Sequence, residues 1–388
     1  MSERCALCGG GDLHRFLERP GVPVHQNLPR RDAAEARAVT RGDLRLACCR
    51  SCGFIGNLAF RAELTEYGES YDNDQNWSPT FDAHVDELID RLIGSGLTDQ
   101  LIVEVGCGKG TFLRRLCARG NNRGIGFDPS YVGDLSVDGG RVTFVREMYG
   151  GAHRHVAPDA VVCRHVIEHV GQPSLLLDAV KAALHQPARL YFETPDVGWI
   201  LRGGVIQDFF YEHCSYFTPA SLTYAFARAG FATREVRAVF GGQYMWLEAE
   251  HIPGAVVDAA LPAPPLPVVT EAEGYATAER GRLRRLAGVL AAMRAEGPVA
   301  IWGAGAKGVT FANLLDPGAS LLDGVIDINP RKQGMFIPGT GHPIRGPEAI
   351  AVRGLTNVVV MNGNYLGEIR AAVARDGLAT RIHDEAAL

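Results

Sequence analysis

A glycine-rich turn between a predicted strand and a predicted helix is the feature that most constrains the fold. The run LIVEVGCGKG covers residues 101–110, and the helix-forming run TFLRRLCARG follows it. Glycine tolerates positive φ and lets a ligand approach the backbone without a side-chain clash. A strand, a glycine turn and a helix in this order therefore predict an α/β sheet with a ligand at the turn.

The acids around this turn indicate the class of ligand. Glu104 stands before three alternate glycines, whereas the dinucleotide fingerprint GxGxxG has its acid about 20 residues later. The three glycines are Gly106, Gly108 and Gly110. A carboxylate at Glu104 would repel a pyrophosphate, and Asp128 at the end of the next predicted strand can accept from both ribose hydroxyls. We therefore expect S-adenosylmethionine (SAM); an ordinary sheet turn, the alternative, requires neither acid.

Two CxxC pairs predict a metal site near the N-terminus. The pairs are Cys5 with Cys8 and Cys49 with Cys52. Four thiolates complete the tetrahedral coordination of Zn²⁺ and leave no position for water, so we expect one structural zinc. Cys48 adjoins the second pair, but the CxxC spacing favours Cys49. A redox dithiol is the alternative, although such motifs usually occur singly at a helix start.

Composition excludes several classes of protein. The 388 residues are 46% hydrophobic and 21% charged, as in soluble globular proteins of two or three domains. A net charge of −5 without a basic run argues against nucleic-acid binding. No apolar run reaches the ~18 residues of a membrane span, and MSERCALC has no apolar signal region. We expect a cytoplasmic protein without a membrane partner, in which the nine cysteines are metal-bound or buried.

An alternation of strands and helices continues after the glycine turn. Strands are predicted at 141–145, 159–163 and 188–196, with helices at 174–184 and 220–230. This alternation predicts a doubly wound parallel sheet, in which ligands bind outside the carboxyl ends of the strands. Those ends also carry Glu193 and three further predicted cofactor contacts, Met148, Arg164 and His165.

Two histidines at one of these strand ends allow a second interpretation. His165 and His169 stand four residues apart at a predicted helix start, a spacing that suits metal ligands. No third ligand is evident in the sequence, which favours packing of both rings against the cofactor.

The segment 207–218, QDFFYEHCSYFT, has the composition of an active-site wall. His213 is the natural general base near neutral pH, and Glu212 beside it can orient the imidazole. Tyr211 or Tyr216 can donate to an oxyanion that develops during the reaction. We predict these four residues to be catalytic; a structural histidine with satisfied hydrogen bonds is the alternative.

The composition changes after residue 251. Residues 251–270 are rich in Pro and Ala, which is typical of a linker, and an amphipathic helix is predicted at 278–297. A second glycine turn follows, with Gly303, Gly305 and Gly308 in GxGxxG spacing and Asp327 at the end of the next strand. This pattern predicts a Rossmann-like half, and NAD binding for hydride transfer is an alternative. We expect a zinc domain at 1–60, a methyltransferase domain at 61–250 and a Rossmann-like domain at 251–388.

The order of these motifs resembles the zinc-containing SAM-dependent sugar C-methyltransferases of deoxysugar biosynthesis. The matches cover nearly all 388 residues: Cys5, Cys8, Cys49 and Cys52; 104–110; Asp128; 212–217; 303–308; 327–334; 338–340; and 343–344. The resemblance implies a small-molecule substrate, a sugar nucleotide held between the methyltransferase and Rossmann-like domains. It also implies proton removal alpha to a keto group by His213, followed by methylation of the carbanion. Lys307 and the C-terminal turn would bind the phosphate or nucleotide end.

Departures from the family pattern concern the substrate side. Phe210 stands where the family usually has Tyr, and the run 71–78 keeps Tyr71 but loses the neighbouring Tyr. Residues 361–364 read MNGN where the family tends to have Pro-Trp-Asn. The predicted substrate-binding residues are Tyr71, Gln75, Phe210, Lys307 and Asn364. The acceptor is therefore open, and O- or N-methylation of another natural-product or glycan precursor is the alternative.

Overall fold

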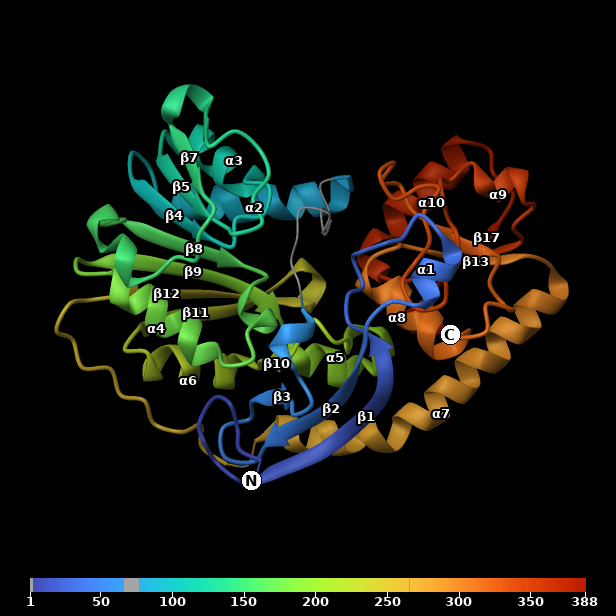
Figure 1. Ribbon diagram of the computed structural model, residues 1–388, viewed down its shortest axis with the longest axis horizontal. Helices are drawn as coiled ribbons and strands as arrows, with labels where there is room; N and C mark the ends of the chain where they lie inside the picture. Colours follow the sequence, from blue (N-terminus) through green and yellow to red (C-terminus); the bar gives the residue numbers. More distant parts are fainter. Residues whose placement is uncertain (1–2, 66–76, 265) are drawn as a thin grey trace.

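Three β-sheets organise the chain, as seen in a computed structural model that describes residues 3–65, 77–264 and 266–388 (Figure 1). The N-terminal sheet has four strands, the central sheet eight and the C-terminal sheet five. Two of the predicted substrate-binding residues, Tyr71 and Gln75, lie outside the described ranges. Among the described helices, none combines the length and apolarity that a membrane crossing needs.

The central sheet confirms the predicted doubly wound architecture. Its strand order is β11-β12-β9-β8-β4-β5-β7-β6, and the five strands from β9 to β7 are parallel. These five are β4 (Leu101–Val105), β5 (Arg123–Phe127), β7 (Val142–Val145), β8 (Ala160–Arg164) and β9 (Ala188–Pro195). Antiparallel strands complete both edges: β6 (Ser136–Val137), β11 (Ala232–Val239) and β12 (Tyr244–His251).

Helices cover both faces of this sheet because successive strand residues point to opposite sides. In β4, Ile102 packs with α2 (Pro79–Gly94) and α3 (Thr111–Gly120). The next residue, Val103, packs with α4 (Pro173–Ala183) and α6 (Pro219–Arg228) on the other face. The amphipathic pattern of α2 follows the helical period, with Phe81, Val85, Leu88, Ile89 and Leu92 buried. The parallel strand ends are thereby fixed at one edge of the sheet.

The N-terminal sheet contains a strand from a distant part of the chain. It consists of β1 (Leu13–Pro23), β2 (Arg41–Cys49), β3 (Ile55–Asn57) and β10 (Ser215–Tyr216), with the short helix α1 (Ala33–Arg37) between β1 and β2. Ser215 pairs with Gly56 and Tyr216 with Ile55. The segment 207–218 is therefore anchored on the N-terminal sheet, while α5 (Val197–Gly203) connects it to the end of β9.

The C-terminal sheet is parallel in the order β15-β14-β13-β16-β17. Its strands are β13 (Val299–Trp302), β14 (Gly324–Ile326), β15 (Ile344–Arg345), β16 (Asn357–Val360) and β17 (Arg381–Asp384). The associated helices are α7 (Pro267–Glu296), α8 (Ala306–Leu315), α9 (Ala349–Val352) and α10 (Leu366–Arg375). Short 3-10 turns include η1 (Ala62–Leu64), η2 (Asp138–Gly140), η3 (Gly151–Val156), η4 (Ile167–His169), η5 (Ile206–Asp208), η6 (Phe240–Gly242), η7 (Gly363–Tyr365) and η8 (Glu385–Ala387).

Helix α7 is longer than the sequence pattern predicts and connects two cores. It begins at Pro267, inside the predicted linker, because Val268, Val269 and Ala272 pack against the N-terminal sheet. Leu286 and Leu290 pack against the C-terminal sheet. In Figure 1, α7 runs along the lower right of the molecule from the N-terminal sheet to the C-terminal lobe. The linker is therefore shorter than expected, and the three domain boundaries stay a prediction.

Candidate cofactor and acceptor site

The first glycine turn permits a close approach to the backbone. Gly106 has φ +70°, and a Cβ there would lie 2.3 Å from Val166 Cγ2. Gly110 has φ +74°, and its Cβ would lie 2.2 Å from the ring of Phe144. Gly108, with φ +52°, has open space where its Cβ would be. Only glycine fits the first two positions, and the third presents bare backbone where a ligand can lie.

Glu104 is a buried carboxylate beside this turn. Only 3% of it is exposed, and its Oε2 has no hydrogen-bond partner among the described residues. Burial raises the pKa of Glu104 to about 8, and Asp128 adds to this effect, although Arg164 opposes it. An unpartnered buried oxygen at a ligand-binding turn suits the ammonium group of SAM, which would neutralise it.

Asp128 is fixed at the other side of the turn. Its Oδ2 accepts from the backbone N–H of Gly108 at 2.8 Å, and its Oδ1 accepts from the N–H and hydroxyl of Ser130 at 2.8 and 2.6 Å. A carboxylate can accept about four hydrogen bonds, so capacity remains for ribose hydroxyls. The residues present therefore fit SAM at both of its polar ends.

The other predicted cofactor residues differ in environment. Met148 is 79% exposed, just beyond the end of β7. Arg164 donates through Nε to Glu193 Oε2 at 2.8 Å and lies 4.4 Å above the Phe112 ring, with Nη2 unpartnered among the described residues. His165 has φ +54°, an uncommon backbone conformation for a residue with a Cβ.

A buried charge network lies beneath His165. Glu193 is fully buried and also contacts His84 Nε2 at 2.7 Å. Burial opposes its ionisation, but Arg164 and His165 hold the pKa of Glu193 well below its ordinary value. Burial likewise disfavours charge on His165, yet Glu193 and Glu168 outweigh it and raise the pKa of His165 to about 9. Glu193 is thus tied up in ion pairs and does not face an acceptor as a base.

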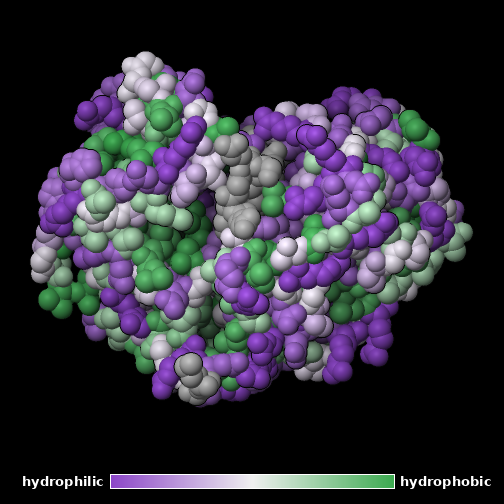
Figure 2. All heavy atoms as spheres, viewed as in Figure 1, coloured by the Kyte–Doolittle hydropathy of each residue, from purple (hydrophilic) through white to green (hydrophobic). Residues whose placement is uncertain are grey.

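A cavity of about 270 Å³ lies between the central and C-terminal sheets. In the space-filling view the surface is hollowed between these two lobes (Figure 2). The central side of the cavity includes His165, Glu168, His169, Phe210, His213, Gln243 and Tyr244. The C-terminal side includes Gly303, Gly305, Lys307, Asp327, Lys332 and Asn362.

His213 lies in the cavity wall as the sequence predicts. Its ring is 4.1 Å from that of Phe210 and 4.7 Å from that of His169, the latter at 89°. Within the described residues, neither ring nitrogen of His213 has a hydrogen-bond partner. Burial and the neighbouring His169 lower the pKa of His213 well below its ordinary value. The imidazole is therefore neutral at neutral pH and has a lone pair available.

Glu212 does not orient His213, contrary to the sequence prediction. It is fully buried, and its Oε1 lies 3.1 Å from His25 Nδ1 while its Oε2 accepts from the N–H of Gln26 at 2.9 Å. Glu212 therefore faces the N-terminal part, whereas His213 lines the cavity.

Neither predicted catalytic tyrosine lines the cavity. The hydroxyl of Tyr211 accepts from the N–H of Arg61 at 2.9 Å, and its ring packs where a Cβ on Gly42 would come within 2.3 Å. The hydroxyl of Tyr216 bonds the backbone of Phe210 at 3.3 Å. Both tyrosines anchor the segment 207–218, and neither hydroxyl points into the cavity, where the predicted oxyanion would develop.

The predicted acceptor residues are divided between the cavity and its surroundings. Phe210 and Lys307 line the cavity; Lys307 is paired with Asp208 and lies 5.2 Å from the Trp199 ring centroid. Asn364 is not in the lining, because its amide donates to Phe240 O at 3.0 Å. Asn362, two residues earlier, lines the cavity instead and donates to Gln243 Oε1 at 3.0 Å.

The cavity is also lined by four residues that the sequence did not predict there: Glu168, Asp208, Gln243 and Tyr244. Only Glu168 had a local signal, since it lies between the two histidines of RHVIEHV. Asp208 lies in the turn η5, Gln243 directly follows η6 and Tyr244 begins β12, positions that no spacing rule describes.

The second glycine turn is likewise tightly built. A Cβ on Gly308 would lie 1.8 Å from Gly303 O. Asp327 Oδ2 accepts from the N–H of Ala304 at 2.7 Å, and Lys332 Nζ donates to Ala304 O at 3.3 Å. This arrangement brings two lysines, Lys307 and Lys332, to the C-terminal wall of the cavity.

The four predicted metal ligands form one cluster. The Sγ atoms of Cys5 and Cys52 are 3.6 Å apart, those of Cys8 and Cys49 are 3.5 Å apart, and all four lie within 4.8 Å of one another. Tetrahedral Zn–S bonds of about 2.3 Å place thiolates about 3.8 Å apart, so the cluster fits such an ion.

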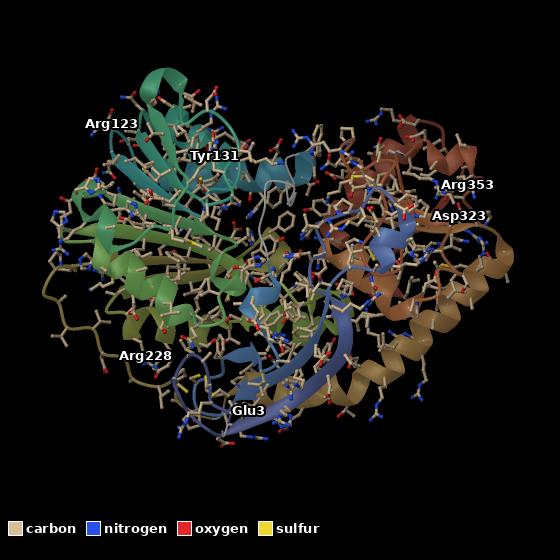
Figure 3. The ribbon with its side chains drawn as sticks, viewed as in Figure 1. Glu3, Arg123, Tyr131, Arg228, Asp323 and Arg353 are labelled. Atoms are coloured by element: carbon tan, nitrogen blue, oxygen red, sulfur yellow. The ribbon has the colours of Figure 1, made fainter. Side chains whose placement is uncertain are left out.

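Cys48 lies outside this cluster and contacts Cys49 O, as the spacing predicts. Arg228 of α6, which Figure 3 labels, donates to Leu7 O at 2.5 Å and so ties the first pair to the helix layer of the central sheet.

Comparisons with known proteins identify the enzyme class. Residues 80–236 match the "Methyltransferase domain" family, and residues 270–377 match the "C-methyltransferase C-terminal domain" family. The C-methyltransferase NovU of Streptomyces niveus is 26% identical over 389 residues, which are 95% of this chain and 91% of that protein.

Solved methyltransferase structures resemble part of the chain. The Burkholderia thailandensis 1,6-didemethyltoxoflavin-N1-methyltransferase, with 1,6-didemethyltoxoflavin and S-adenosylhomocysteine bound, is 16% identical, covering 44% of this chain and 79% of its own (TM-score 0.33). Magnesium protoporphyrin IX methyltransferase from Synechocystis PCC 6803 is 18% identical, covering 44% and 84% (TM-score 0.34). The two domain matches and the NovU match favour methyl transfer over hydride transfer, and this protein is a SAM-dependent methyltransferase with sequence similarity to C-methyltransferases.

Proposed function

We propose that the protein methylates a carbon next to a carbonyl group in a small-molecule acceptor, of the nucleotide-linked deoxysugar class. The acceptor lies in the cavity between the central and C-terminal sheets. The relation to NovU supports C-methylation, and the two lysines on the C-terminal wall favour an anionic phosphate end. A phosphate there would compete with Asp208 for Lys307.

The first glycine turn and its two acids hold the cofactor in this proposal. Glu104 would hold the ammonium group and Asp128 the ribose hydroxyls. SAM, when bound, supplies the electrophilic methyl group. Catalysis then depends mainly on proximity and alignment, which can account for ~7–11 kcal/mol of a barrier.

His213 is the proton acceptor in the proposed reaction. The observation that carries this role is a ring in the cavity wall whose nitrogens have no partner among the described residues. The C–H bond beside the carbonyl breaks, its proton moves to His213, and its electron pair forms an enolate. The enolate carbon would then accept the methyl group that bound SAM supplies, with S-adenosylhomocysteine as the leaving group. Lys307, on the C-terminal wall of the cavity, adds positive charge that favours the anion.

The first prediction tests this role with His213→Asn, which keeps a polar side chain but removes the base. We expect SAM affinity to stay the same and kcat to fall by ~10²–10⁴-fold, the usual effect of general-base loss. Exchange of the acidic C–H with solvent deuterium should fall in parallel, since it requires only proton removal. Mass spectrometry of the acceptor measures both quantities.

Tyr211→Phe is the matched control, because its hydroxyl contacts Arg61 outside the cavity and should leave the exchange rate unchanged. Normal turnover and exchange in His213→Asn would make His213 structural.

O- or N-methylation remains the alternative for the same cavity, because Phe210 replaces a family tyrosine on its wall. There His213 would deprotonate a hydroxyl or an amine. NMR of the product locates the new methyl group, and the absence of C–H exchange would favour this alternative.

A further inference from the structure

Three metal-ligating side chains meet in the wall of the acceptor cavity. Glu168 and His169 lie in the turn η4 that follows β8, and His213 comes from the segment 207–218. One ligand atom of each lies within 4.8 Å of the other two, and all three line the cavity. The Cys₄ cluster is a separate group, built from other residues.

The donor set is that of a metal site with open positions. Two imidazoles and one carboxylate are the protein ligands of many catalytic Zn²⁺ sites and of other transition-metal sites. The rings of His169 and His213 stand at 89°, with centroids 4.7 Å apart, so they converge without stacking. Three protein ligands would leave at least one coordination position of such an ion open.

Supporting hydrogen bonds orient the carboxylate. Glu168 is 1% exposed; its Oε1 lies 3.2 Å from His165 Nδ1, and its Oε2 accepts from the hydroxyl of Thr194 at 3.0 Å. Partners of this kind, outside the ligands themselves, are typical of metal sites, where they fix ligand orientation. The carboxylate keeps further lone pairs for an ion.

Backbone contacts fix the distance between the two ligand-bearing segments. The N–H of Cys214 donates to Glu168 O at 2.9 Å, and the hydroxyl of Ser215 donates to Val170 O at 2.7 Å. The residue after His213 is thus bonded to the residue before His169. The three ligands are preorganised by the fold, which lowers the entropic cost of closing a site around an ion.

We propose that Glu168, His169 and His213 bind one divalent cation of the Zn²⁺ or Co²⁺ type. Cation binding itself does not depend on the proposed function; only its expected effect on catalysis rests on the proposed role of His213 as the base. A nitrogen lone pair that coordinates a metal cannot also accept a proton, so the cation and the acceptor proton compete for His213. Loading the cavity with the cation therefore removes the base and stops proton removal.

The second prediction measures cation binding in the full chain with its Cys₄ metal already in place. Elemental analysis and Co²⁺ absorption should show one further equivalent, with nitrogen and oxygen ligation distinct from thiolate ligation. Glu168→Gln should weaken this second equivalent by more than the ~10–100-fold typical of losing a supporting hydrogen bond. His169→Gln, which changes a different turn residue, should do the same and covers the case in which Glu168→Gln does not fold.

Glu147→Gln is the matched control, since Glu147 forms an exposed pair with His153 and should leave the second equivalent unchanged. Deuterium exchange of the acceptor, followed during Zn²⁺ titration, then separates the two proposals. Loss of exchange in step with the second equivalent supports both. Exchange that continues with the second equivalent bound keeps the cation site and overturns His213 as base. If the wild type binds no second equivalent of the cation, the proposed cation site is overturned. The role of His213 as base is then decided by the His213→Asn variant.

Discussion

At the residue scale, Glu104 couples cofactor binding to pH. Its pKa is raised to about 8, mainly by burial and further by Asp128, while Arg164 opposes this. The unliganded protein therefore holds a proton on Glu104 at neutral pH. Because the folded pKa exceeds the ordinary value of 4.5, the stability linked to this proton is present below pH 4.5 and is lost as pH rises toward 8. The ammonium group of a bound ligand would favour the ionised carboxylate of Glu104 instead of the protonated form.

The third prediction follows from this coupling. The complex needs a carboxylate at Glu104 and an ammonium group on SAM, whose α-amino pKa is about 8. SAM affinity should rise from pH 6, reach a maximum near pH 8 and then fall, which calorimetry in buffers of different ionisation enthalpy measures. Glu104→Gln should lose the rising limb, whereas Glu147→Gln should keep it. A wild-type affinity that is constant between pH 6 and 8 would contradict the assignment.

Short sequence patterns predicted which residues belong to the site better than they predicted the directions in which the side chains point. The glycine turn and its acids could be predicted, because glycine conformation and charge are properties of a few adjacent residues. In the segment 207–218 the composition indicated a site, and His213 does face the cavity. Glu212 and Tyr211 face the N-terminal part, and Tyr216 bonds its own segment's backbone. An irregular segment has no period from which such directions follow.

At the element scale, long periodic segments were predictable and short pairings were not. The predicted strands and helices of the central sheet are all present because each has an apolar face of its own. The two-residue strand β10 exists only through its pairing with β3, which is distant in sequence. The sequence did not predict the start of α7, because the surrounding residues are rich in Pro and Ala. This part of the chain is helical because Val268 and Tyr275 pack on the N-terminal sheet.

The fourth prediction concerns the Cys₄ cluster, which contributes to the folding of the N-terminal sheet. We propose one structural Zn²⁺ per chain, bound by Cys5, Cys8, Cys49 and Cys52. Replacing Cys49 and Cys52 together by Ser should remove the ion and lower Tm, because zinc binding is part of the folding free energy of such knuckles. Elemental analysis and thermal denaturation measure these effects.

Cys48→Ala is the control for that experiment, since Cys48 is buried beside the cluster but outside it. It should keep one zinc per chain. Full zinc stoichiometry in the double variant would mean that other residues hold the ion.

At the scale of the whole molecule, the N-terminal part contacts both larger lobes. Gly339 N donates to Ala36 O at 2.7 Å, so α1 packs on the C-terminal lobe, as Figure 1 shows. Arg30 pairs with Phe336 through an isolated bridge. Contacts between residues so far apart in sequence cannot be read from composition, and they hold the two walls of the cavity in one arrangement.

Arg19 is a buried link in this arrangement. Its guanidinium donates to Ile206 O and Phe209 O at 2.9 and 3.0 Å and pairs with Glu279 of α7 at 2.7 Å. It is 6% exposed and also donates to the hydroxyl of Tyr275. One side chain therefore joins β1, the start of the cavity segment and the helix that leads to the C-terminal sheet.

The fifth prediction is that Arg19→Met lowers the free energy of unfolding by about 3–5 kcal/mol, the usual result of removing one partner of a buried ion pair. The loss arises because Glu279 keeps a desolvated charge and two carbonyl oxygens lose their donor. Arg50→Ala is the matched control: Arg50 pairs with Glu273 of the same helix at 3.0 Å, but both side chains are exposed, so its cost should stay below about 1 kcal/mol. Urea denaturation followed by circular dichroism gives both values. Equal stabilities for the two variants would show that α7 is held by its apolar face alone, and the cavity walls would then depend on Val268, Val269 and Tyr275.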